Sequence, residues 1–178
     1  MKKLFMLLLI AGTIALTACK SDDDEIVQPT PKDAIVGTWV SEGANVAFGL
    51  TVAPFNVTKI VATFNENKSY TVVQTDKNGV NTTLSGTYTF TETSSTDKSG
   101  KTNTADAKIY NIVANQSTPS AVVAQGICAF KDNNMSYEVI QVTPPLAGVL
   151  APTAVGGFGS TSIAGTAYAI YIQKYVKQ

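Results

Sequence analysis

The sequence predicts an all-β domain, an eight-stranded antiparallel up-and-down barrel. From Ile35 onwards, apolar and polar residues alternate in short runs, and no stretch shows a sustained apolar period of 3.6 residues. Eight such runs follow one another, and nearly every connection is short enough to join antiparallel neighbours. An open meander would leave two exposed edges, which closure into a barrel removes. A two-sheet sandwich satisfies the same pattern with Greek-key crossings.

Turn signals separate the predicted strands. Residues 65–68 and 131–134 are of types that tolerate left-handed backbone, and Asn78-Gly79 is a strong hairpin signal. The polar run 92–106 is long enough to form a mobile hairpin tip. The predicted strands are residues 35–42, 58–64, 69–75, 80–90, 108–114, 122–130, 135–142 and 166–176.

The N-terminal residues follow the pattern of a secretory signal peptide, with basic residues before an apolar run. Lys2 and Lys3 precede an apolar run from residue 4 to about 16, which is too short to span a bilayer as a helix. The following Leu16-Thr17-Ala18-Cys19 resembles the lipobox of bacterial lipoproteins. The resemblance implies that residues 1–18 are a cleaved leader and that Cys19 is acylated and attaches the chain to a membrane. An ordinary signal peptide with an incidental cysteine is the alternative.

The residues after Cys19 indicate a tether. Residues 20–25, KSDDDE, resemble the acidic export signal of Bacteroidetes-type lipoproteins, which implies a lipid-anchored protein on the outer face of the outer membrane. A solvated linker without a signal is the alternative, and the spacing of a calcium loop is missing. Residues 26–33 continue as a proline-containing spacer. The predicted organisation is therefore a leader (1–18), an acylated cysteine with a flexible linker (19–33) and one barrel domain (34–178).

Composition excludes several function classes. All thirteen basic residues are Lys and are balanced by thirteen acidic residues, so the chain lacks the basic excess that nucleic-acid binding requires. It contains neither His nor Arg, which excludes histidine-activated nucleophiles and the usual zinc sites. We predict no catalytic residues, no metal and no cofactor. Apart from Cys19 the only cysteine is Cys128, whose neighbours would not lower its pKa, and we predict that it is a core residue.

A tryptophan at the start of the domain suggests a family. Gly37-Thr38-Trp39 resembles the Gly-x-Trp signature that opens the first strand of lipocalins, and residues 62–71 and 86–88 are similar to later strands of small lipocalin-like domains in Bacteroidetes-type lipoproteins. The resemblance covers about residues 35–176. It implies that Trp39 closes one barrel end beneath an arginine from the last strand. Because this chain has no Arg, Lys174 is the candidate cation. The alternative is a solvated Lys174.

Two long connections are unusually apolar. Residues 43–56 and 144–165 are rich in Gly, Ala and Pro and carry no charge, whereas surface loops are usually polar. By position, the first corresponds to the loop across the mouth of lipocalins. We expect both to line or cap the mouth, although they could also plug a ligand-free barrel or dock on a membrane or a partner protein. The apolar residues concerned are Phe48, Leu50, Phe55, Leu146, Leu150 and Phe158.

Two functions of different class follow. The first is a non-enzymatic binding module that holds a small apolar or amphipathic ligand. The second is a structural or interaction lipoprotein with a filled barrel that docks an envelope partner through its apolar loops. An interior void above about 300 Å³ would favour the first, and a filled interior with an exposed apolar patch would favour the second. The candidate ligand-binding residues are Phe48, Phe55, Tyr70, Tyr88, Tyr110 and Tyr168.

Overall fold

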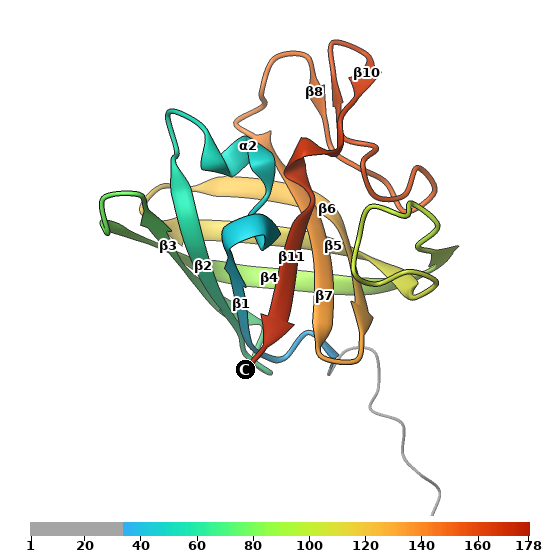
Figure 1. The fold of residues 1–178 in the computed structure, drawn as a ribbon, viewed down its shortest axis with the longest axis horizontal. Helices are drawn as coiled ribbons and strands as arrows, with labels where there is room; N and C mark the ends of the chain where they lie inside the picture. Colours follow the sequence, from blue (N-terminus) through green and yellow to red (C-terminus); the bar gives the residue numbers. More distant parts are fainter. Residues whose placement is uncertain (1–33) are drawn as a thin grey trace, which may run out of the picture.

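The structure is a computed structural model that describes residues 34–178. The predicted signal peptide, acylated Cys19 and tether lie outside these residues. The described chain forms a closed barrel with the strand order β1-β11-β7-β6-β5-β4-β3-β2, which confirms the predicted eight-stranded antiparallel architecture (Figure 1). Between residues 34 and 178, no helix is both long and apolar enough to cross a bilayer.

Five of the eight barrel strands begin and end within two residues of the predicted runs, and those predicted over residues 80–90 and 108–114 extend six and four residues further. The barrel consists of β1 (Gly37–Glu42), β2 (Val57–Phe64), β3 (Ser69–Asp76), β4 (Asn81–Thr96), β5 (Lys108–Thr118), β6 (Val122–Lys131), β7 (Asn134–Thr143) and β11 (Gln173–Lys177). Short elements outside the barrel are η1 (Gly43–Asn45), α2 (Phe48–Thr51), β8 (Val149–Leu150), β9 (Ser162–Ile163), β10 (Thr166–Ala167) and η2 (Ala169–Tyr171).

Closure comes from the pairing of the first strand with the last. β1 pairs with β2 along its whole length, and on its other edge Trp39 faces Lys177 and Val40 faces Val176 in β11. The backbone amide of Gln178 also donates to the carbonyl oxygen of Thr38 at 2.9 Å. The two open edges of the meander are therefore paired with each other.

The predicted strand over residues 166–176 is wrong in its first half. Thr166 and Ala167 belong to a separate three-stranded sheet, β8-β9-β10, and residues 169–171 form the 3-10 turn η2 before β11 begins at Gln173. The alternation of Tyr168, Ile170 and Ile172 with smaller residues imitates a strand, but this stretch crosses from the small sheet to the barrel and η2 contacts α2 on the way.

Aromatic side chains fill the end of the barrel nearest both described termini. The Trp39 side chain is 1% exposed, and its indole Nε1 donates to the carbonyl oxygen of Ile35 at 2.8 Å. Its ring lies 5.7 Å from that of Phe130, which in turn contacts Phe90 and Tyr110. We call this end the closed end; the opposite end, beside α2, is the mouth (Figure 1).

A second, smaller core lies outside the barrel wall. Ile109 and Ile127 are fully buried on the outer face of β5 and β6, beneath Phe158 from the connection between β7 and β11. Glu138 in β7 holds this connection, because its side-chain oxygens accept hydrogen bonds from the Gly159 and Thr161 amides and from the Thr161 hydroxyl. The predicted cap of residues 144–165 therefore covers the outer wall as well as rising beside the mouth (Figure 1).

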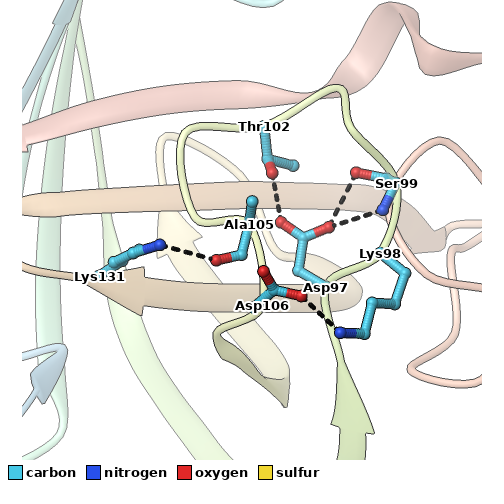
Figure 2. A network of polar contacts seen from close by, with 7 residues as sticks. All are labelled: Asp97, Lys98, Ser99, Thr102, Ala105, Asp106 and Lys131. Carbon is cyan, nitrogen blue, oxygen red and sulfur yellow. Dashed lines mark hydrogen bonds and ion pairs between the residues drawn. The ribbon is translucent and has the colours of Figure 1, made fainter.

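The polar run 92–106 does contain the predicted hairpin tip, since β4 and β5 pair up to Thr96 and Lys108, but the loop between them is shorter than the run and is held by hydrogen bonds. β4 continues to Thr96, and the buried Asp97 closes the connection to β5. Figure 2 shows its side chain accepting hydrogen bonds from the Ser99 amide and hydroxyl and from the Thr102 hydroxyl. The buried Thr104 hydroxyl also lies 3.0 Å from Asp97 Oδ2. Short hydroxyl side chains thus satisfy a buried carboxyl group and order the loop.

Cys128 has the predicted structural role. Its side chain is fully buried in β6, and it is a free cysteine. Burial raises the pKa of the Cys128 thiol well above its usual value, so the thiolate is disfavoured.

Candidate functional site

A cavity of about 180 Å³ occupies the half of the barrel next to the mouth. Inward-facing residues of the barrel strands form its walls, and Ala47 and Leu50 cover it from the loop after β1. Because side chains alternate across a strand, every second residue of each strand reaches the interior. Its apolar lining includes Leu50, Ile60, Val72, Leu84, Ala124 and Val139.

The first apolar loop lies across the mouth, as its position in the sequence predicts. Gln173 in β11 holds it there, since its Oε1 accepts a hydrogen bond from the Ala47 amide at 3.0 Å. The Gln173 Nε2 donates to the Ser41 hydroxyl and to the Asn45 carbonyl oxygen, the latter at 3.3 Å. The short helix α2 then places Leu50 towards the cavity and leaves Phe48 facing solvent.

Three tyrosines form the floor of the cavity. Tyr70, Tyr137 and Tyr175 come from β3, β7 and β11, and all three line the cavity. The Phe64 ring lies between them and the closed end, 6.1 Å from the Tyr70 ring and 6.4 Å from the Tyr137 ring. The Tyr137 and Tyr175 rings meet edge to face at 6.2 Å.

These hydroxyls are protonated at neutral pH. Burial raises the pKa of Tyr70, and it raises the pKa values of Tyr137 and Tyr175 well above the usual range. For Tyr137, the neighbouring Tyr175, Cys128 and Tyr70 raise the pKa further. Among the residues that the structure describes, no Lys, Asp or Glu lines the cavity. The site is therefore an apolar chamber with uncharged hydrogen-bonding groups.

Of the six candidate ligand-binding residues, Tyr70 is the one that lines the cavity. Phe48 and Phe55 are 63% and 56% exposed, and Tyr168 is also exposed. These three rings do not line the cavity, because the segments that carry them turn the rings to the outside.

The other two candidates are packed at the closed end. The Tyr88 hydroxyl donates to the carbonyl oxygen of Asn65 at 2.9 Å, and its ring meets that of Phe64 edge to face. The Tyr110 ring stacks on Phe90 with 4.6 Å between centroids. Both tyrosines face the interior, as the strand pattern indicates, but at the level that aromatic rings fill.

The remaining apolar loop residues lie in different parts of the structure. Leu50 lines the cavity, whereas Leu146 and Leu150 are exposed beside the mouth. Phe158 is buried in the outer core on the barrel wall. The second apolar loop thus contributes none of its three predicted residues to the cavity.

The cation over Trp39 is Lys177, not the predicted Lys174. The Lys177 Nζ lies 5.1 Å from the centre of the Trp39 ring. Lys174 shares a strand face with Ile172, as expected, but that face is the outer one, where Lys174 pairs with Ser136. The odd-numbered residues of β11 face inward, so Lys177, two residues beyond Tyr175, reaches the Trp39 ring.

Replacing Lys177 with methionine should lower the free energy of unfolding by about 1 kcal/mol, because the cation is lost from the Trp39 ring while the apolar stem remains. This corresponds to a fall of about 3 °C in the thermal midpoint. Lys174→Met is the matched control and should leave the midpoint unchanged. A Lys177→Met midpoint equal to that of the unmodified protein would show that the contact does not stabilise the fold.

Sequence reasoning missed Tyr137, Tyr175 and Gln173. Tyr137 alternates with Val139 in a predicted strand, so its inward position was available from the pattern. The series Tyr171-x-Gln173-x-Tyr175-x-Lys177 is equally regular, but Ile170 and Ile172 make the opposite face the more apolar one and favour it as the interior. No sequence signal distinguishes these faces, because Ile172 is buried against the outer core.

Comparison with protein-family models, with curated proteins and with solved structures found no match to this chain.

Proposed function

We propose that this chain is a lipid-anchored, non-enzymatic protein of the cell envelope, displayed at the outer-membrane surface, whose lipocalin-like barrel holds a small apolar or amphipathic ligand. The observation that carries the binding role is the cavity beneath Leu50, with a floor of three tyrosines and mainly apolar walls that also include Gln74, Gln116, Tyr171 and Gln173. The anchoring and the location rest on the Lys2-Lys3 leader, the lipobox ending at Cys19 and the acidic run after it.

The cavity limits the size of what can be enclosed. Its volume of about 180 Å³ falls short of the roughly 300 Å³ void that would favour a binding module for a drug-sized molecule, so the proposal is restricted to a smaller ligand. An apolar cavity of about 150 Å³ in another protein holds one benzene ring. The enclosed part of the ligand is therefore a single ring or a short chain, and any remainder extends through the mouth past α2.

Filling the cavity should abolish binding. Ala124 lines the cavity from β6, and Ala124→Trp places an indole in the space a ligand would take. We expect at least tenfold weaker binding of a small aromatic probe such as acetophenone, followed by chemical-shift titration. Ala121→Trp is the control, since Ala121 is exposed three residues earlier. Equal probe affinities for the two variants, with both still folded, would argue against binding inside the barrel.

A surface feature favours docking to an envelope partner as a second candidate function. Residues 43–58 and 139–173 contain no charged residue. Phe48, Phe55 and Tyr168 from these segments are exposed, and so are Leu150 and Val155. An uncharged surface with several exposed apolar side chains is typical of an interaction site.

Native mass spectrometry of protein purified from its own envelope distinguishes the two functions and tests the anchor. The proposal expects a mature chain that begins at an acylated Cys19 and carries a co-purifying mass of a few hundred daltons or less. A stoichiometric protein partner without a small molecule would favour docking. An unacylated Cys19 would contradict the anchoring.

A further inference from the structure

We propose that the cavity selects an uncharged ligand with an oxygen acceptor, such as a small ketone, ester or amide, whose oxygen points to the tyrosine floor. This inference rests on the proposed binding function and specifies its ligand class. Three observations carry it: three free hydroxyls converge on one chamber, the chamber lacks charge, and its volume admits a single ring or short chain.

The first observation is the set of available donors. Within residues 34–178, the hydroxyls of Tyr70, Tyr137 and Tyr175 have no hydrogen-bond partner, in contrast to the Tyr88 hydroxyl on Asn65. In the same part of the chain, every fully enclosed side-chain N or O atom does have a partner. The three hydroxyls therefore face open space, and the space that their residues line is the cavity.

The second observation is that the three tyrosines that carry these hydroxyls lie in one region of the cavity. Tyr137 and Tyr175 meet edge to face, and Tyr137 and Tyr70 both pack on Phe64. A carbonyl oxygen has two lone pairs and can accept from two of these hydroxyls at once. A purely apolar ligand would leave all three donors unpaired, which is unfavourable in a buried site.

The third observation concerns charge. A carboxylate in the cavity would be desolvated without a cation to pair with, because no Lys lines the cavity in the described chain. Tyr70 and Tyr175 are 7% and 5% exposed, so water has little access to the floor. A cationic ligand would similarly find no carboxyl group. A neutral acceptor satisfies the hydroxyls without this penalty.

Four probes of nearly equal size test the inference: acetophenone, its isostere α-methylstyrene, benzoate and phenyltrimethylammonium. We expect acetophenone to bind about fivefold more tightly than α-methylstyrene, as one or two net hydrogen bonds allow. Benzoate at neutral pH should bind at least tenfold more weakly than acetophenone. Chemical-shift titration of the full purified chain provides the affinities and places the probes in the barrel.

Tyr→Phe variants keep the aromatic ring and remove the hydroxyl group, so they test whether the hydroxyls cause the selectivity. In Tyr137→Phe/Tyr175→Phe, the preference for acetophenone over α-methylstyrene should fall to nearly one, while the affinity for α-methylstyrene stays the same or rises. Tyr110→Phe is the control, since Tyr110 stacks on Phe90 away from the cavity lining, and it should keep the preference.

The outcomes separate this inference from the proposed function. Equal binding of acetophenone and α-methylstyrene, or tightest binding of benzoate or phenyltrimethylammonium, would overturn the neutral-acceptor inference and leave an apolar binding barrel. Retained preference in the double variant would also overturn it. Failure of all four probes to bind would overturn the binding function and the inference together.

Discussion

Trp39→Ala is expected to lower the free energy of unfolding by about 3–5 kcal/mol, the usual cost of truncating a buried tryptophan. The side chain is 1% exposed, packs on Phe130, accepts the Lys177 cation over its ring and donates to the Ile35 carbonyl oxygen. The thermal midpoint should fall by roughly 10 °C. Because Trp39 is the chain's single tryptophan, circular dichroism rather than indole fluorescence is the appropriate signal.

Phe48→Ala is the matched control for Trp39→Ala. The Phe48 ring is large and aromatic but mostly exposed on α2, so its removal should change the free energy of unfolding by less than about 0.5 kcal/mol. If urea unfolding showed similar midpoints for the two variants, the closed end would not be the main site of stabilisation.

Glu138→Ala should destabilise the protein by about 3–5 kcal/mol. The Glu138 side chain is fully buried and accepts from the Gly159 amide at 2.6 Å, the Thr161 amide at 3.3 Å and the Thr161 hydroxyl at 2.6 Å. Its removal leaves three donors without an acceptor, each at a cost of about 1–3 kcal/mol if it stays buried. The loop avoids part of this cost by leaving the wall, so hydrogen exchange at Gly159 and Thr161 should accelerate strongly.

The control for Glu138→Ala is Glu42→Ala at the end of β1. Glu42 makes one exposed ion pair with Lys59 at 3.2 Å, and such pairs contribute about 0–1 kcal/mol. Unchanged exchange at Gly159 in Glu138→Ala would mean that the outer core around Phe158 holds the loop without the carboxyl group. Glu138→Gln should have an intermediate effect, because the amide retains one acceptor oxygen.

The fold was largely predictable because strand alternation and turn residues are local signals. Asn78-Gly79 falls between strands in both the sequence and the structure, and the turn predicted at residues 131–134 narrows to Asp132-Asn133 between β6 and β7. Residues 166–172 were not predictable, since their alternation matches a strand while their partners lie in the small sheet and the outer core. The hydrogen bonds that order the loop around Asp97 were not predictable, because a polar run does not specify which hydroxyl group donates to which carboxyl group.

The site was less predictable than the fold. The alternation of β3 and β7 places Tyr70 and Tyr137 inside, but it does not say at which height along the barrel a side chain stands. Height decides whether a ring fills the closed end, as Tyr88 does, or lines the cavity. It depends on the strand register and on where η1 and α2 cover the mouth, and these arise from contacts distant in sequence such as that of Ala47 with Gln173.

The described chain begins and ends at the same pole of the barrel, since Ile35 packs under Trp39 and Gln178 bonds to Thr38. A protein coupled to a sensor chip directly through Gln178 is therefore held by its sealed base. Its entrance then points outward, away from the support. Such an orientation leaves the mouth open to molecules that arrive from solution.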